Sequence, residues 1–266
     1  MQALLNIAVR AARRAADVIV RSLNRLDSLE VTSKGRNDFV TEIDRTAEAE
    51  IIQIIRRAYP DHAFLGEESG ASGDSPFQWI IDPLDGTTNF LHGFPQFAVS
   101  IACSIRGRIE HGVIYDPMRQ EIFTASRGEG AQLENRRIRV TQQRGLEGAL
   151  IGTGFPYRAN TEHIDAYMAM LRDVMLTTAG VRRPGSAALD LAYVAAGRTD
   201  GFFEIGLGPW DTAAGSLLIE EAGGIVSTLS GNEYRQGGNI VAGAPRVHAA
   251  LLALLAPHLT PALRDQ

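Results

Sequence analysis

The 266-residue chain contains one cysteine, Cys103, and one lysine, Lys34. A single cysteine excludes an internal disulfide and any metal site built from several cysteines, and it fits a reducing, cytoplasmic setting. A single lysine excludes any site that needs a second one. No apolar run reaches the roughly 18 residues of a membrane-spanning helix, and the Gly-x-x-x-x-Gly-Lys motif of P-loop nucleotide enzymes does not occur.

The overall composition is that of an ordinary globular protein. Hydrophobic residues make up 45% of the chain and charged residues 21%, which is typical of a chain that buries a sizeable core. The formal net charge is −5, so nothing in the overall charge favours an anionic membrane surface or direct binding of nucleic acid.

The first 25 residues are rich in arginine, which superficially resembles an organellar targeting segment. However, apolar residues recur at helical spacing from Leu4 to Leu23, with the arginines mostly on other faces. We therefore favour an ordinary first helix. A second helix is expected over 43–59, with Thr41 as its N-cap and Pro60 stopping it.

The middle and the end of the chain differ in pattern. Short β-rich runs separated by turn residues between about 77 and 142 indicate a largely antiparallel sheet. Beyond about 145, strand-like and helical segments alternate, which is typical of layered α/β structure. We expect an N-terminal half (1–143) and a C-terminal half (144–266) that pack as one unit, with a site between them.

Several short segments end in an acid after an apolar run, so that a buried strand delivers a carboxylate to its edge. The acids in question are Asp44, Glu67, Glu68, Asp82, Asp85, Glu204 and Asp211. Each has an ordinary structural interpretation on its own, as a turn, a helix cap or a solvated loop. Their combination favours one shared site.

Residues 80–89 carry the strongest signal. Ile80 and Ile81 predict the end of a buried strand at Asp82, and Pro83 is expected to stop its ladder. Asp82 and Asp85 can then face one point. Thr87 and Thr88 are expected to cap a short helix whose N–H groups suit a phosphate.

Oxygen ligands of this kind suit Mg²⁺, and one carboxylate such as Asp82 could bridge two ions. A bare cluster of acids would repel a phosphate dianion, so that binding of a phosphate there requires divalent cations. The cluster therefore predicts metal dependence, provided that the acids converge in space.

Three segments resemble the signatures of the inositol monophosphatase family: Gly66-Glu67-Glu68-Ser69, Asp82-Pro83-Leu84-Asp85-Gly86-Thr87-Thr88-Asn89-Phe90 and Trp210-Asp211-Thr212-Ala213-Ala214-Gly215. The resemblance covers essentially the whole chain. The segment Gly185–Ala192 favours the bacterial branch. The resemblance implies a layered α-β-α-β-α fold, a homodimer, sensitivity to lithium and two to three Mg²⁺ ions per site.

The resemblance also implies roles for individual residues. Glu67, Asp82 and the Leu84 carbonyl would hold one metal; Asp82, Asp85 and Asp211 would hold a second; Glu67 would help a looser third. Asp44 and Thr87 match the pair that orients and deprotonates the attacking water. Glu68 matches a position that supports the metal ligands without binding a metal itself. The positions expected to contact phosphate or substrate hydroxyls are Asp85, Gly86, Thr87, Gly185, Ala187, Glu204 and Asp211.

The implied function is Mg²⁺-dependent hydrolysis of a small polyol phosphate, myo-inositol monophosphate first, by direct attack of a metal-activated water. Two departures bear on the choice of polyol. Pro184 removes a backbone donor before Gly185, and Gly154-Phe155-Pro156-Tyr157 replaces a more polar loop of some relatives.

Other interpretations remain to be tested or are excluded. Fructose 1,6-bisphosphate, histidinol phosphate and nucleotide 3′-phosphates are alternative substrates for the same fold. Some members of the bacterial branch are associated with ribosomal RNA transcription complexes, so a role as a non-catalytic partner is a second hypothesis. An aspartyl-phosphate phosphatase is excluded, because Asp82 and Asp85 are three residues apart rather than two and no lysine follows them.

Overall fold

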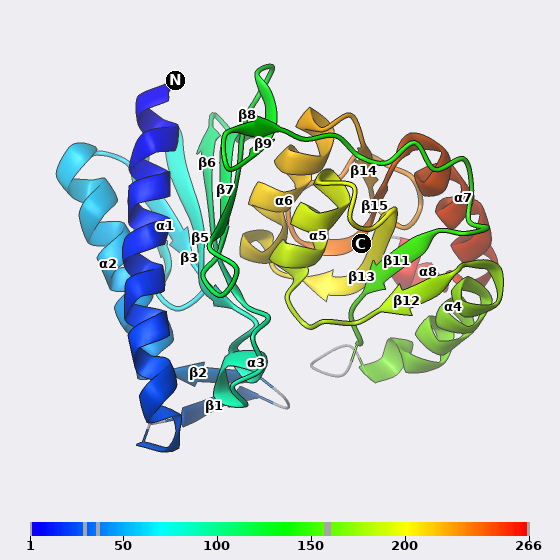
Figure 1. Cartoon of the computed structure of the whole chain (residues 1–266), viewed down its shortest axis with the longest axis horizontal. Helices are drawn as coiled ribbons and strands as arrows, with labels where there is room; N and C mark the ends of the chain where they lie inside the picture. Colours follow the sequence, from blue (N-terminus) through cyan, green and yellow to red (C-terminus); the bar gives the residue numbers. More distant parts are fainter. Residues whose placement is uncertain (1, 29–30, 36–37, 157–160, 265–266) are drawn as a thin grey trace.

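Helices and sheets alternate in five layers in the computed structural model, which describes residues 2–28, 31–35, 38–156 and 161–264 (Figure 1). The outer helices α1 (Gln2–Ser22) and α2 (Glu42–Ala58) cover an eight-stranded sheet. Next come α5 (Ala187–Ala195) and α6 (Pro209–Glu221), then a five-stranded sheet, then α4 (Ile164–Thr177) and α7 (Pro245–Leu255). The expected α-β-α-β-α sandwich is confirmed.

The first sheet has the strand order β10-β9-β8-β7-β6-β5-β3-β4 and is antiparallel except for the parallel pair β3 and β5. Its strands are β3 (Ala63–Gly66), β4 (Gly70–Ser72), β5 (Phe77–Asp85), β6 (Ala98–Ile105), β7 (Arg108–Asp116), β8 (Glu121–Ser126), β9 (Gly130–Leu133) and β10 (Arg136–Arg137).

The second sheet has the order β12-β11-β13-β15-β14, with β11 parallel to both of its neighbours. Its strands are β11 (Leu150–Thr153), β12 (Gly180–Arg182), β13 (Gly201–Leu207), β14 (Ile225–Ser227) and β15 (Gly238–Gly243). The smaller elements are β1 (Val31–Gly35), β2 (Asp38–Thr41), α3 (Thr87–Leu91) and α8 (Pro261–Arg264).

The two predicted N-terminal helices form as expected. The buried stripe of α1 consists largely of alanines, among them Ala8, Ala11 and Ala15, and small side chains allow close packing against α2 and the sheet. Thr41 caps α2 by accepting a hydrogen bond from the Ile43 N–H (3.0 Å). No helix among the described residues is long and apolar enough to span a bilayer.

The middle helix layer is shared between the two sheets, because one core cluster combines residues of β5 to β9 with residues of α5, α6 and β15. The expected division into 1–143 and 144–266 stays a prediction. Glycine allows the closest approach: a Cβ on Gly112 of β7 would lie 3.0 Å from the Ala214 carbonyl oxygen of α6. That contact fixes the distance between the first sheet and α6.

Gly112→Ala is expected to destabilise the protein by about 1–3 kcal/mol, because the new methyl group meets helix backbone that cannot rotate away. The measurement is urea unfolding. Gly145→Ala is the matched control, since a Cβ there meets no atom within 4 Å. Equal unfolding midpoints for the two variants would contradict the close packing of β7 on α6.

Candidate metal centre

Strand β5 places two acids on one face of the sheet by means of a bulge. Asp82 pairs with Ser100 and Asp85 pairs with Ala98, so three steps on β5 match two on β6. Residues three apart on a regular strand would point to opposite faces, and the extra residue brings both carboxylates to the same face. The expectation that Pro83 ends the ladder at Asp82 is wrong: a bulge accommodates the residue that lacks an N–H, and β5 continues to Asp85.

The third acid comes from the first turn of α6. The Gly208 N–H donates to Asp211 Oδ2 (2.6 Å), which fixes the carboxylate at the start of the helix. The Ser100 hydroxyl donates to the Trp210 carbonyl (3.2 Å) and thereby ties this helix start to the strand beside Asp82.

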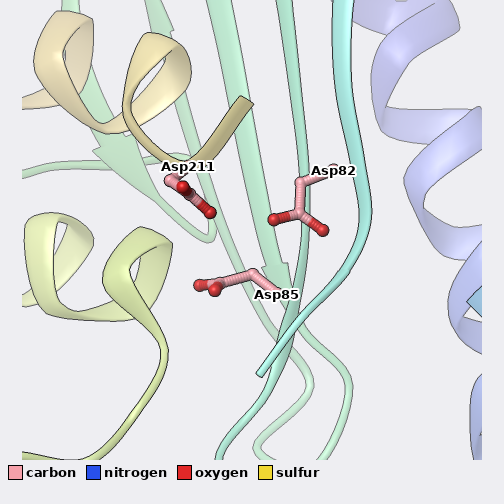
Figure 2. Close-up of side chains that lie close together, drawn as sticks. All are labelled: Asp82, Asp85 and Asp211. Carbon is pink, nitrogen blue, oxygen red and sulfur yellow. The ribbon is translucent and has the colours of Figure 1, made fainter. Parts of the chain in front are cut away.

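The carboxylates of Asp82, Asp85 and Asp211 lie close together around one small space (Figure 2). Each offers one oxygen such that the three oxygens lie within 4.8 Å of one another, and all three residues are buried. Burial raises the pKa of Asp82 well above its ordinary value, and the charges of Glu67, Asp85 and Asp211 raise it further. A divalent cation would relieve this repulsion, so the all-oxygen donor set fits Mg²⁺.

Glu67 lies beside this cluster because β3 runs parallel to β5. Its N–H donates to the Ile81 carbonyl (3.1 Å), and its side chain hydrogen-bonds Asp82. Glu68 turns the other way and lines a surface groove against α2 together with Ser69. The Leu84 N–H donates to Asp82 Oδ1 (3.0 Å), whereas the Leu84 carbonyl lies 3.1 Å from Thr87 Oγ1.

Asp44 and Thr87 form a pair across 43 residues of chain, with Thr87 Oγ1 3.0 Å from Asp44 Oδ1. Thr41 donates both its N–H (2.8 Å) and its hydroxyl (2.6 Å) to Asp44 Oδ2, which fixes the carboxylate. Burial raises the pKa of Asp44, while these hydrogen bonds lower it. The expected capping by threonine side chains is wrong for α3: Gly86 is the N-cap, and the Thr87 hydroxyl is used by Asp44 and Leu84.

One cavity brings together every residue predicted to contact the substrate: Asp85, Gly86, Thr87, Gly185, Ala187, Glu204 and Asp211. The turns at Gly86 (φ 96°) and Gly185 (φ 91°) both adopt left-handed backbone. Asn89 Nδ2 joins them by donating to the carbonyls of Pro184 (2.8 Å) and Gly185 (3.2 Å). The two halves of the chain thus meet at the cavity.

The structure adds site residues that the sequence predictions omit. The Ser186 hydroxyl (2.6 Å) and the Ala188 N–H (2.7 Å) both donate to Asp85 Oδ2 and orient it. A serine directly before a predicted helix is an N-cap signal that could have identified Ser186. Asp190 also lines the cavity; burial raises its pKa well above the ordinary value, helped by the charges of Glu204 and Asp85.

Two apolar residues also line the cavity. These are Phe155 and Pro156, and the Arg183 guanidinium lies 5.0 Å from the centre of the Phe155 ring. A Cβ on Gly154 would overlap the Glu204 carboxylate, so glycine is what allows Glu204 to reach its position. Tyr157, the last residue of this expected departure from some relatives, lies outside the described residues.

In the metal-free protein, Asp82→Asn is expected to raise the free energy of unfolding at neutral pH. The carboxyl is protonated in both states below its ordinary pKa of 3.8. Because its folded-state pKa is raised, stability falls as the pH climbs from 3.8 through that raised value. Denaturant unfolding in EDTA measures this effect, and the advantage of the variant should shrink toward acid pH.

Excess Mg²⁺ is expected to reverse the order, because binding to the folded state stabilises the wild type more than the variant. A wild-type protein that is the more stable of the two in EDTA at neutral pH would contradict the repulsion described at Asp82.

Comparison with known proteins identifies the family. A model of the inositol monophosphatase family matches residues 1–260. The chain is 56% identical to the Nus factor SuhB of Pseudomonas aeruginosa over 270 residues, which cover 99% of this chain and 100% of that protein.

Solved structures agree as well. The extragenic suppressor protein suhB from Bartonella henselae superposes with a TM-score of 0.92 at 47% identity, covering 95% of this chain and 98% of that one. The inositol monophosphatase from Anabaena (Nostoc) sp. PCC 7120 gives 0.84 at 40% identity, covering 96% of each chain. The match over nearly the whole length, with the acids gathered in one buried site, shows that the chain belongs to the inositol monophosphatase family.

Proposed function

We propose that the protein is a Mg²⁺-dependent phosphatase that hydrolyses the phosphate ester of a small polyol, with myo-inositol monophosphate as the leading candidate substrate. The observation that carries the proposal is the convergence of Asp82, Asp85 and Asp211, buried and within 4.8 Å of one another. Membership of the family and the inositol monophosphatase from Anabaena among the similar structures support it.

The acids divide into sets that share Asp82. In the proposed assignment Glu67, Asp82 and the Leu84 carbonyl would hold one ion, and Asp82, Asp85 and Asp211 would hold a second. A third, looser ion would be held near Glu67. When bound, Mg²⁺ supplies positive charge that lowers the pKa of water and neutralises phosphate oxygens.

Asp44 and Thr87 are proposed to orient and deprotonate the attacking water. Their hydrogen bond and the two donors from Thr41 fix the geometry of the pair. A general base contributes about 10²–10⁴ in rate, whereas hydrolysis of phosphate monoesters requires up to about 10²¹-fold acceleration. The pair therefore supplies a minor share, and neutralisation of charge supplies most of the acceleration.

The cavity suits a compact ligand with one phosphate and several hydroxyl groups. The N–H groups of Gly86 and Thr87 are proposed to bind the phosphate. Asp85 and Glu204 face the same cavity as Gly185 and Ala187, and carboxylates accept hydrogen bonds from hydroxyl groups. In this proposal Glu68 supports the neighbouring metal ligand Glu67 without contacting an ion; Glu68 lines the groove against α2 and not the cavity.

The apolar residues of the cavity bear on the choice of substrate. Phe155 is 41% exposed and lines the cavity with Pro156 and Arg183, so part of the ligand would meet an aromatic ring and a guanidinium in place of the more polar loop of some relatives. Fructose 1,6-bisphosphate, histidinol phosphate and nucleotide 3′-phosphates therefore stay within the proposal as alternatives. Sensitivity to lithium and a homodimeric state are also proposed, from the family resemblance.

A steady-state assay of phosphate release from these four substrate types, with and without Mg²⁺ and Li⁺, tests the proposal. We expect turnover of myo-inositol 1-phosphate that requires Mg²⁺ and falls with Li⁺. Asp82→Asn and Asp211→Asn should each lower kcat by at least about 10³-fold, since each removes a carboxylate that the cations require, and the phosphate in turn requires the cations.

Two results would contradict the proposal. One is no phosphate release from any member of the panel, and the other is near-normal turnover by Asp82→Asn at saturating Mg²⁺. Arg14→Gln is the control variant, because Arg14 lies in an exposed ion pair with Glu50 on the outer helices.

A second function, as a partner in a transcription complex, is favoured by one observation: a protein 56% identical over its whole length is named a Nus factor. The partner role would need the folded surface and not the acids. A strain that lacks the gene should then regain its transcription phenotype with Asp82→Asn as well as with the wild type. Failure of the folded variant to rescue would tie the phenotype to the metal centre.

A further inference from the structure

Helix α2 carries a second buried acid besides Asp44. Glu48 is 2% exposed and lies one helical turn after Asp44, so both side chains project from the same face of the helix. Burying a carboxylate is unfavourable unless hydrogen bonds replace the lost water. The partners of Glu48 therefore indicate what it does.

Both oxygens of Glu48 accept hydrogen bonds from consecutive backbone N–H groups. Oε2 accepts from the Glu68 N–H and Oε1 from the Ser69 N–H, each at 2.9 Å. The same carboxylate also lies against Gly66: a Cβ on Gly66 would overlap it, with Oε1 only 2.8 Å away. The carboxylate of Glu48 thus lies flat against the segment from Gly66 to Ser69.

Glu67 is in the middle of that segment. Its own N–H donates to the Ile81 carbonyl of β5 (3.1 Å), which ties the segment to the strand that carries Asp82. Its side chain hydrogen-bonds Asp82. Hydrogen bonds thus hold the backbone at Glu67 and at the two residues after it, and this backbone sets where the Glu67 side chain starts relative to Asp82.

We propose that Glu48 is a positioning residue that holds Glu67 next to Asp82 and thereby sets the affinity of the site for Mg²⁺ without contacting the ion. This inference rests on the proposed function. Helix α2 then positions two parts of the site. Asp44 contacts Thr87 (3.0 Å), and Glu48, one turn later in the helix, binds the segment that carries Glu67.

A purely structural role for Glu48 makes a different prediction. In that case its loss would lower the stability of the fold, and the folded fraction would still bind Mg²⁺ normally. Affinity for Mg²⁺, measured well below the unfolding temperature, therefore separates positioning from stabilisation.

The test is Mg²⁺ binding by isothermal titration calorimetry, alongside assays over a range of Mg²⁺. Glu48→Gln has nearly the same shape but sets an amide NH₂ against a backbone N–H donor, so one of the two hydrogen bonds is lost. We expect about 10- to 100-fold weaker Mg²⁺ binding, the usual cost of losing a group that orients a ligand. At saturating Mg²⁺, kcat should recover to within about threefold of the wild type.

Gly66→Ala disturbs the same contact in a second way, because the new methyl group would displace the Glu48 carboxylate. It should weaken Mg²⁺ binding similarly, and the double variant should bind about as weakly as the worse single variant, since both changes break one contact. Glu50→Gln is the matched control on the same helix. Its only described contact is the exposed pair with Arg14 (3.2 Å), and its Mg²⁺ affinity should equal that of the wild type.

The outcomes are distinct. A wild type that binds no Mg²⁺ would overturn the proposed function itself. A wild type that binds Mg²⁺, with Glu48→Gln binding equally well, would overturn only the positioning role. If Glu48→Gln does not fold, Glu48→Asp decides, since it keeps the charge and both acceptor oxygens but withdraws them by one methylene group: weaker Mg²⁺ binding by the folded variant supports the proposal, and wild-type affinity overturns it.

Discussion

The buried carboxylates of the candidate metal centre repel one another, and the fold has to hold them together against that repulsion. One carboxylate oxygen from each of the buried residues Asp82, Asp85 and Asp211 lies within 4.8 Å of the others, an arrangement that is unfavourable unless cations are present. Folding energy gained elsewhere must hold them there. Residues at functional sites are commonly held in arrangements that lower the local stability of the fold.

Three elements of the fold hold these acids and Asp44 in place. The bulge in β5 turns Asp82 and Asp85 to one face, α6 carries Asp211 in its first turn, and α2 fixes Asp44. Each element is anchored in a large core, and the contact of Gly112 with Ala214 shows how closely sheet and helix are fitted. A site built on strands and helices is held more precisely than one built on loops. The layers thus serve the site as well as the fold.

Much of this could be predicted from the sequence, because the acids follow recognisable apolar runs and the helices have regular periods and caps. The family resemblance brought Asp211 together with Asp82 and Asp85, although 126 residues separate Asp85 from Asp211. The bulge at Pro83 was not predicted, since a proline after a strand indicates an end as readily as an irregularity. The use of the Thr87 hydroxyl by Asp44 depends on a tertiary contact that no local pattern reveals.

Glu48 and Asp190 were missed for a related physical reason. A glutamate within a helix is normally a solvated side chain, and nothing near Glu48 in sequence shows that its partners lie 20 and 21 residues later. Asp190 sits in a run of helix-forming residues and acquires its buried setting only when the two halves of the chain meet. Residues that act through backbone partners carry weaker sequence signals than residues that act through motifs.

The central claim is that the buried acids converge in order to bind divalent cations, and anomalous diffraction from crystals soaked in Mn²⁺ tests it most directly. The account predicts a strong anomalous peak in contact with carboxylate oxygens of Asp82, Asp85 and Asp211. Well-diffracting crystals that show no such peak among these three residues at saturating Mn²⁺ would contradict it.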